Sequence, residues 1–306
     1  MTPFSHVTIV GAGAMGCLFA ARLREAGTAV TLVDTDMARL AAIRANGVTI
    51  KDDRGRRAIA VAALPAAEAG PTDLVMLFTK GMHSGAAIRS VAHLAVGGAC
   101  AITLQNGLGN AEAMAEVFPR DRILMGVTDL PADLSPPATV SSHGTGRIWV
   151  GAMAPDRPAQ VEAAVALFNA AGLPAERDDH VDVQIWEKVG FNAALNALAA
   201  VTRLRVGGLD CPAGREIAFA VLDEVAATAA ASGLALSSER MRAKVEHALA
   251  NHREHKASML QDIEAGRRTE IGSINGAVIR AAEAHGVPTP VTRTLANLVR
   301  MIEATP

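Results

Sequence analysis

The chain has 306 residues, half of them hydrophobic and a fifth charged, with a formal net charge of −2. This length predicts two domains with sizeable cores, and the nearly neutral charge gives no general attraction to nucleic acid or to an anionic membrane. Cys17, Cys100 and Cys211 are widely spaced, so we expect buried, reduced thiols. Because there is no secretion signal and no apolar run long enough to span a membrane, we expect a cytoplasmic protein that binds neither nucleic acid nor a membrane.

A strand, a glycine-rich loop and a helix open the chain, in the order that dinucleotide binding requires. The β-branched run at residues 7–10 is followed by a loop and then by a helical pattern to about Ala26. In such a loop the glycines allow a tight turn, close approach of the backbone to the pyrophosphate, and packing of a helix whose N-terminus attracts phosphate. An ordinary glycine turn between strand and helix is the alternative. The candidate cofactor-binding residues of the loop are Gly11, Ala12, Gly13, Ala14, Met15 and Gly16.

Asp34 ends the second predicted strand, residues 29–33, and lies eighteen residues after the last glycine of the loop. An acidic side chain at this place can accept hydrogen bonds from both ribose hydroxyls of NAD(H), and it would repel the 2′-phosphate of NADP(H). Asp34 is therefore a further candidate cofactor-binding residue, and it favours NAD(H).

Three further strands are predicted at residues 73–78, 100–104 and 122–126. Ligands of an open parallel sheet bind outside the carboxyl ends of its strands. This rule places Lys80 and Asn106, which follow two of these strands, on the same rim as the glycine loop. The alternatives are a surface lysine and an ordinary Asn-Gly turn.

The segment after these strands has a more mixed pattern. Residues 128–151 combine prolines and glycines with two short apolar runs, which predict a loop and an antiparallel hairpin at the edge of the sheet. Residues 158–171 predict an amphipathic helix, and residues 173–177 predict another strand.

The character of the chain changes near residue 180, after a charged stretch. Strand-like runs end there, and Ala-rich helical sequence continues to the C-terminus. We therefore predict an α/β dinucleotide-binding domain over residues 1–180 and an all-α domain over residues 181–306. After its first helix, the second domain is predicted to contain helices at about residues 214–232, 237–250, 274–285 and 292–302.

The first helix of the second domain, residues 182–200, carries an unusual polar row. Lys188, Asn192 and Asn196 recur every four residues, which places them on one face within an apolar background. A solvated surface row is one interpretation, but such faces are usually wide and mixed in charge. The other is a binding row for an oxoacid, in which the ammonium faces the carbonyl oxygen and the amides face hydroxyl and carboxylate groups.

Several separate motifs follow one another along nearly the whole chain. They are residues 11–16, Lys80, Gln105-Asn106-Gly107, Trp186-Glu187-Lys188 with Asn192 and Asn196, and residues 258–262, 269–271 and 275–276. Together they resemble the motifs of the ketopantoate (2-dehydropantoate) reductase family. The resemblance implies a Rossmann-type domain, an all-α domain and a substrate cleft between them. It also implies reduction of 2-dehydropantoate to (R)-pantoate with a nicotinamide cofactor, on the way to pantothenate and coenzyme A.

The resemblance also implies roles for individual residues. Lys188 would be the general acid and Glu270 its carboxylate partner. A ketone that accepts a hydride develops negative charge on its oxygen, and a lysine can both hold that oxygen and protonate it. The alternatives are that Glu270 is a surface acid paired with Arg267, and that Ser258 is a helix N-cap. By resemblance, the substrate-binding residues are Asn106, Lys188, Asn192, Asn196 and Ser258, and the residues near the nicotinamide ribose are Lys80 and Asn106.

The chain departs from the family pattern at three places. The family default is NADP(H), with a basic residue where this chain has Asp34. Val206-Gly207 stands where an Asn-Gly pair is common, and Gly272 stands where an acid is common. The loss of one hydrogen bond to a substrate hydroxyl changes discrimination by about 1–3 kcal/mol. A different 2-oxo acid, branched or aromatic, is therefore an alternative substrate.

Two alternatives, a nucleotide sensor and a zinc protein, fit the sequence less well. A non-catalytic nucleotide sensor would need neither Lys188 nor Glu270. A zinc site at His252 and His255, at helical spacing, has no carboxylate cluster to complete it, so we expect no metal. The expected partner is a small 2-oxo acid, and a homodimer is compatible with the sequence.

Overall fold

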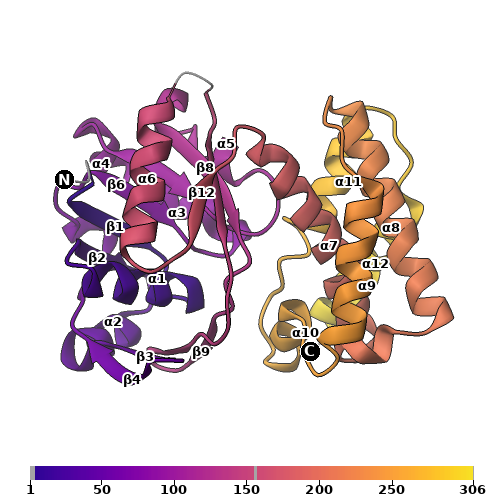
Figure 1. Cartoon of the computed structure of the whole chain (residues 1–306), viewed down its shortest axis with the longest axis horizontal. Coiled ribbons are helices and arrows are strands. Elements are labelled where there is room, and N and C mark those ends of the chain that lie inside the picture. Colours follow the sequence, from indigo (N-terminus) through magenta and orange to yellow (C-terminus); the bar gives the residue numbers. More distant parts are fainter. Residues whose placement is uncertain (1–3, 155–156, 306) are drawn as a thin grey trace. The chain divides into compact units, whose positions relative to one another are not determined.

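The structure, a computed structural model, describes residues 4–154 and 157–305. The chain forms two compact units (Figure 1). One unit comprises Met1–Gln105 and Asn110–Val181, and the other comprises Asn106–Gly109 and Asp182–Pro306. We call them the α/β unit and the helical unit, and each is described by itself.

The α/β unit is built on an eight-stranded sheet with the strand order β12-β11-β8-β7-β6-β1-β2-β5. Neighbouring strands are parallel except β8 and β11, which are antiparallel. The central strands β1, β6 and β7 are largely apolar and almost entirely buried, as expected for a sheet that is covered on both faces. The strands are β1 (His6–Val10), β2 (Ala29–Val33), β5 (Ala62–Leu64), β6 (Leu74–Leu77), β7 (Cys100–Thr103), β8 (Ile123–Thr128), β11 (Ile148–Ala152) and β12 (Ala175–Arg177).

Helices cover the sheet and bury two apolar clusters. Phe19 of the first helix packs edge-on against Phe168 of the sixth at a ring-centroid distance of 5.5 Å, and in a tilted arrangement against Phe78 after β6 at 4.8 Å. These contacts hold two helices and one strand end together in a single core. The helices of this unit are α1 (Ala14–Glu25), α2 (Met37–Asn46), α3 (Ser84–Ser90), α4 (Ala92–Val96), α5 (Asn110–Met114) and α6 (Pro158–Ala170).

A second, four-stranded sheet with the order β4-β3-β10-β9 corrects the prediction for residues 128–151. The hairpin of β9 (Asp133–Ser135) and β10 (Thr139–Ser141) pairs with β3 (Val48–Asp52), which in turn pairs with β4 (Gly55–Ile59), so it does not lie at the edge of the main sheet. The apolar run that follows forms β11, an interior strand of the main sheet.

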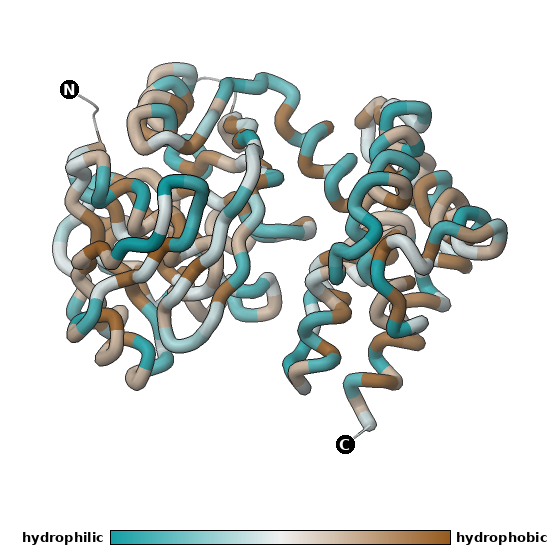
Figure 2. The backbone as a smooth tube through the Cα atoms, turned by 60° about the horizontal axis from the view of Figure 1, so that its bottom comes forward, coloured by the Kyte–Doolittle hydropathy of each residue, from teal (hydrophilic) through white to brown (hydrophobic). Residues whose placement is uncertain are grey.

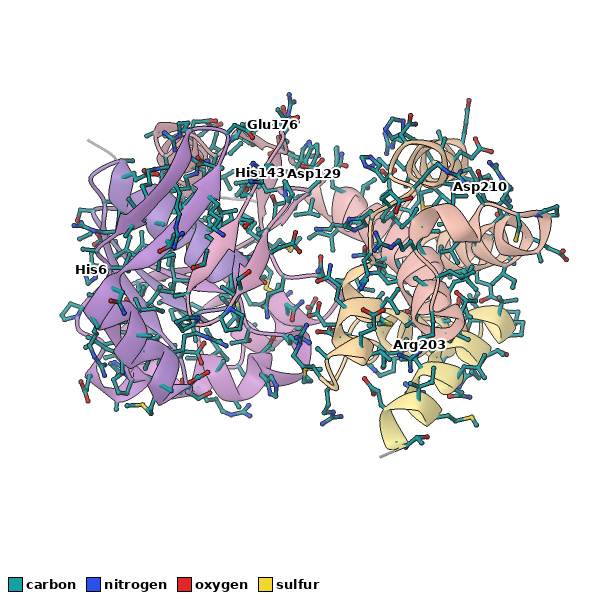
Figure 3. All side chains as sticks on the ribbon, turned by 90° about the horizontal axis from the view of Figure 1, so that it is seen from below. His6, Asp129, His143, Glu176, Arg203 and Asp210 are labelled. Carbon is teal, nitrogen blue, oxygen red and sulfur yellow. The ribbon has the colours of Figure 1, made fainter. Side chains whose placement is uncertain are left out.

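An arginine at the start of β11 ties this strand to its neighbours. Arg147 donates its backbone N–H to Asp129 and its guanidinium to Glu176, and both acids are labelled in Figure 3. The strand register therefore rests on side-chain charges as well as on the backbone ladder.

The helical unit confirms the all-α prediction and adds a short helix at residues 258–264. Five alanines of α7, from Ala193 to Ala200, are completely buried, which allows the surrounding helices to approach closely. Figure 2 shows the alternation of polar and apolar residues along these helices. The helices are α7 (Val181–Thr202), α8 (Pro212–Ala231), α9 (Ser238–Asn251), α10 (Ser258–Glu264), α11 (Asn275–Ala284) and α12 (Pro290–Ala304).

One sequence-based expectation about individual side chains is wrong in part. All three cysteines are free thiols, but only Cys17 is buried, whereas Cys100 is half-buried and Cys211 is exposed. His252 is the C-cap of α9, which ends at Asn251. Over residues 4–154 and 157–305, no group of three or more His, Cys, Asp or Glu side chains is arranged to hold a metal ion. Within the same ranges, no helix combines the length and apolarity that a membrane span needs.

Candidate active site

The glycine loop has the close contacts that a dinucleotide-binding turn requires. Gly11 has φ +108°, and a Cβ there would lie 2.8 Å from the backbone after β6, while a Cβ on Gly16 would lie 1.8 Å from the Gly11 carbonyl oxygen. Gly13 is the N-cap of α1 and has open space around it. The first turn of α1, which includes Ala14 and Met15, contains no acidic side chain. Its backbone N–H groups thus suit a pyrophosphate.

Cys17 lies beneath this loop as an inert, buried group. Its Sγ donates a hydrogen bond to the carbonyl of Ala12 at 3.4 Å. Burial raises the pKa of the Cys17 thiol to about 12, so the thiol stays neutral near pH 7. Cys17 therefore contributes packing under the loop and is not a nucleophile.

Asp34 holds the glycine loop through its carboxylate. The backbone N–H of Ala12 donates to Oδ2 at 2.6 Å, and that of Asp36 donates to Oδ1 at 2.9 Å. Each carboxylate oxygen can accept more than one hydrogen bond, so these contacts are compatible with a bound ribose. Asp34 and the glycine loop are thus brought together, as the motif predicts.

A polar network joins the ends of β6 and β7 in the α/β unit. Gln105 donates through Nε2 to the carbonyl of Thr79 at 2.5 Å and to the hydroxyl of Ser84 at 2.9 Å. Lys80, which follows Thr79, is half-buried and begins a short turn of helix. The sequence analysis assigned no role to Gln105 itself. Its position between a buried strand and Asn106 could have indicated that it lies at the rim of the sheet. This side chain fixes the backbone next to both candidate residues.

Asn106 belongs to the helical unit, although it directly follows β7. Its Nδ2 donates to Oε2 of Glu270 at 3.5 Å, across 164 positions of sequence. The loop is anchored by the backbone N–H of Leu108, which donates to the carbonyl of Ser273 at 3.0 Å. Gly107, at φ +90°, would place a Cβ 2.3 Å from the same oxygen. Two of the predicted site residues, Asn106 and Glu270, are therefore in contact.

The polar row on α7 is not a solvated surface row. Asn192 and Asn196 are each only 7% exposed, and Lys188 is half-buried. Asn196 donates through Nδ2 to the hydroxyl of Ser258 at 3.3 Å. Ser258 is the first residue of α10, its hydroxyl makes no cap, and the N-cap is Ala257, so the alternative of a capping serine is wrong. The structure thus brings Asn196 and Ser258 together.

The alternative role of Glu270 as a surface acid paired with Arg267 is also wrong. Arg267 donates instead to Asp262 at 3.0 Å, five residues earlier in the chain. Glu270 is half-buried and lies in a bend between α10 and α11, not on a helix. Glu270 contacts Asn106, whereas Arg267 pairs with Asp262.

Sequence reasoning missed a buried acid next to Lys188. The side chain of Glu187 is 0% exposed, and its carboxylate accepts from Arg240 Nε at 2.7 Å and from Lys244 Nζ at 3.0 Å. Gly190, one turn further along α7, lets Met241 of α9 approach to within 3.2 Å of where a Cβ would stand. The first turns of α7 are therefore fixed on α9 by charge and by close packing.

Comparison with known proteins agrees with this geometry. A family model described as ketopantoate reductase PanE/ApbA matches residues 7–155, and the model of the same family's C-terminal region matches residues 180–303. The chain belongs to the ketopantoate reductase family. The resemblance in the sequence is thereby confirmed, and the protein is a nicotinamide-dinucleotide-dependent oxidoreductase.

Relatives in this family match over nearly their whole length. The 2-dehydropantoate 2-reductase of Halobacterium salinarum is 32% identical over 302 residues, which cover 97% of this chain and 99% of the relative. That of Archaeoglobus fulgidus is 32% identical and covers 98% of both chains.

Solved structures give the same fold. The 2-dehydropantoate 2-reductase of Geobacter metallireducens superposes with a TM-score of 0.90 at 31% identity, covering 97% of this chain and 99% of that one. A D-mandelate dehydrogenase in a ternary complex with NADH and anilino(oxo)acetate superposes with a TM-score of 0.94 at 26% identity, covering 97% and 98%. The solved structures that are similar to this chain therefore include enzymes named for two different acids.

Proposed function

We propose that this ketopantoate reductase family member reduces the keto group of 2-dehydropantoate to give (R)-pantoate, with Lys188 as the general acid. The observation that carries the proposal is the contact of Asn106 with Glu270. It joins a motif that follows β7 to a motif near the C-terminus, in the same unit as the Lys188 helix. The contact brings two motifs of the family pattern, 164 positions apart in sequence, next to each other, and this supports a shared site.

The chemistry follows from the charges that these side chains carry. When bound, the reduced nicotinamide supplies the hydride that reaches the ketone carbon. Lys188 stabilises the negative charge that develops on the ketone oxygen and delivers the proton to that oxygen. Glu270 keeps the ammonium charged and oriented. The carboxamides and hydroxyl that hold the carboxylate and hydroxyl of the substrate are those of Asn106, Asn192, Asn196 and Ser258.

Lys188→Ala tests the general acid. We expect kcat to fall by about a hundredfold or more, the usual contribution of a positioned proton donor. Lys256→Ala is the matched control, because Lys256 is a lysine of the same unit that forms a partly exposed ion pair with Glu264. Near-normal turnover of Lys188→Ala would remove this lysine from the mechanism.

The preferred cofactor is NADH. Asp34 places a negative charge at the end of β2, and its carboxylate accepts the backbone N–H of Ala12 in the glycine loop and that of Asp36. The related D-mandelate dehydrogenase was solved with NADH, which supports the same preference here. The residues that would hold the dinucleotide are Gly11, Ala12, Gly13, Ala14, Met15, Gly16, Asp34, Lys80 and Asn106.

The cofactor preference is tested by comparing kcat/KM for NADH and NADPH. We expect a higher value with NADH, and Asp34→Arg should shift the ratio towards NADPH. Asp36→Asn is the matched control, since Asp36 caps α2 through the N–H of Arg39 and lies two residues away. A wild-type preference for NADPH would contradict the proposal.

A second candidate substrate is an aromatic or branched 2-oxo acid. Val206, in the place where relatives commonly have an asparagine, is 3% exposed and packs in the apolar core of the helical unit. Gly207 is held by a hydrogen bond to the Arg253 carbonyl at 2.9 Å, and a Cβ there would lie 2.7 Å from Arg253. The likeness to D-mandelate dehydrogenase favours the same alternative.

A panel of 2-oxo acids, each assayed with both cofactors, separates these substrates. The highest kcat/KM with 2-dehydropantoate supports the leading proposal, and the highest with phenylglyoxylate or a branched 2-oxo acid supports the alternative. Nucleotide binding without turnover of any acid would support a sensor.

A further inference from the structure

An acidic residue in the final turn of the last helix contacts the segment that contains Glu270. Glu303, in the final turn of α12, accepts the backbone N–H of Thr269 on its Oε1 at 2.6 Å. The two residues are 34 positions apart, and Thr269 is only 2% exposed. A carboxylate acceptor makes this hydrogen bond short and strong. If it were lost, a nearly buried donor would have no partner, so the segment would have to rearrange.

This hydrogen bond fixes the peptide that immediately precedes Glu270. On the other side, the hydroxyl of Thr269 accepts from the N–H of Ile271 at 3.1 Å. The carbonyl of Glu270 accepts from the N–H groups of Ser273 at 3.1 Å and of Ile274 at 3.0 Å. The backbone of Glu270 is therefore held before and after the residue, and only its side-chain torsions are left to adjust.

The same segment is attached to the other parts of the proposed site. The carbonyl of Ser273 receives the N–H of Leu108 from the Asn106 loop at 3.0 Å. Asn275, which is completely buried, donates through Nδ2 to the carbonyl of Ala193 on α7 at 3.1 Å. Residues 269–275 thus connect α7, the Asn106 loop and α12. Of the contacts made by Thr269, Ser273 and Asn275, the one between Thr269 and Glu303 lies closest in sequence to Glu270.

We propose that Glu303 is a positioning residue, which acts by holding Glu270 in the orientation that serves Lys188. The inference rests on the proposed role of Glu270 as partner of Lys188. Glu303 touches neither substrate nor cofactor in this scheme. It acts through the Thr269 peptide, so a shift of the Glu270 carboxylate by about 1 Å is enough to lower turnover substantially.

The test compares Glu303→Ala with Glu303→Gln, because the glutamine keeps an oxygen at the accepting position. We expect Glu303→Ala to lower kcat about tenfold, to leave the KM for the cofactor unchanged, and to move the pH dependence of kcat. Glu303→Gln should retain most of the turnover and the wild-type pH dependence. An alanine variant with wild-type kcat and pH dependence would overturn the proposal, and so would equal losses in both variants.

Glu224 supplies the matched control. This α8 side chain accepts the backbone N–H groups of Val291 and Thr292, both at 2.8 Å, at the opposite end of α12. Glu224→Ala removes the same kind of contact from the same helix. We expect it to lower stability without moving the pH dependence of kcat. If Glu224→Ala changed the pH dependence of kcat as much as Glu303→Ala does, the change would result from any loosening of α12, and the proposal would be wrong.

Glu270→Gln distinguishes failure of this inference from failure of the proposed function. If Glu270→Gln leaves kcat unchanged, the proposed mechanism fails, and the inference fails with it. If Glu270→Gln lowers kcat while Glu303→Ala does not, only the inference is overturned. In the double variant Glu270→Gln/Glu303→Ala, we expect kcat to be no lower than in Glu270→Gln alone, because Glu303 acts through Glu270.

Discussion

The ion triad of Glu187, Arg240 and Lys244 supports a sharp prediction about stability. The acid is 0% exposed, whereas the side chains of the two cations are 50% and 47% exposed. Removal of the two cations and removal of the acid therefore have different consequences. When Arg240 and Lys244 are replaced, the Glu187 carboxylate stays buried without these two cations. When Glu187 is replaced, the two half-exposed cations can be solvated by water.

The expected magnitudes follow from this asymmetry. The double variant Arg240→Met/Lys244→Met should lower the free energy of unfolding of the helical unit by about 3–5 kcal/mol, the range for breaking a buried ion pair from one side. Glu187→Gln should lower it by about 1–2 kcal/mol, closer to the effect of ordinary lost hydrogen bonds. The two perturbations remove the same contacts, so their difference reports the burial of the carboxylate.

Urea unfolding at pH 7, followed by tryptophan fluorescence, measures these values. The chain has two tryptophans, Trp149 in β11 and Trp186 in α7. In a Trp149→Phe background, fluorescence therefore reports on the helical unit alone. Asp223→Asn, which breaks an exposed pair with Arg242 between α8 and α9, is the control and should change stability by less than about 1 kcal/mol. If Glu187→Gln destabilised as much as the double variant, the reasoning would be refuted.

Three further predictions concern other parts of the chain. A side-chain hydrogen bond from Arg57 lowers the pKa of the nearly buried Asp52 below its usual value of 3.8. The stabilisation by the ionised Asp52 carboxylate is therefore complete above that pH and is lost as the pH falls through the folded-state pKa. In urea titrations, Asp52→Asn should lower the free energy of unfolding by about 1–3 kcal/mol at pH 7 and by less at pH 3. Cys17, with a pKa of about 12, should resist a thiol reagent at pH 8 in a variant whose other cysteines are serine, and should react once urea unfolds the chain; rapid labelling of the native protein would contradict its burial. Gly107→Ala should lower kcat about tenfold, because the added Cβ would lie 2.3 Å from a carbonyl oxygen, whereas Gly109→Ala, with the same φ of +90° and nothing within 4 Å, should have the smaller effect. Equal kcat values for the two alanine variants would show that backbone strain, not the collision, matters.

Periodicity predicted the parts of the fold that have a simple burial pattern. The central strands of the main sheet are short, largely apolar runs, and the helices of the helical unit carry long apolar stripes, so both could be predicted from the sequence. The second sheet could not. In it, β3 and β4 carry charged side chains such as Lys51 and Arg56, and β9 and β10 are three residues long. Such strands form only because neighbouring strands pair with them.

The placement of the candidate site residues could be predicted where one helix carries them, and less well where distant segments meet. The four-residue spacing of the α7 row places its side chains on one face, and the two asparagines are indeed buried. The position of Asn106 after a strand predicts the rim of the sheet, but the residue contacts Glu270 in the helical unit. Local sequence cannot show this, because the docking depends on a carbonyl of Ser273, 165 positions later than Leu108.

The two acids that support the proposed site illustrate the same limit. Glu187 and Glu303 each stand in a helix where an exposed acid would be unremarkable, and their partners lie 53 and 34 positions away. Glu187 is distinguished by the burial of its own carboxylate, and Glu303 by the burial of Thr269, which donates to it. Both contacts act on backbone that adjoins a proposed catalytic residue, Lys188 or Glu270. A general acid and its partner need a fixed separation more than they need particular neighbours, so the residues that fix this separation can lie on any element that reaches the backbone.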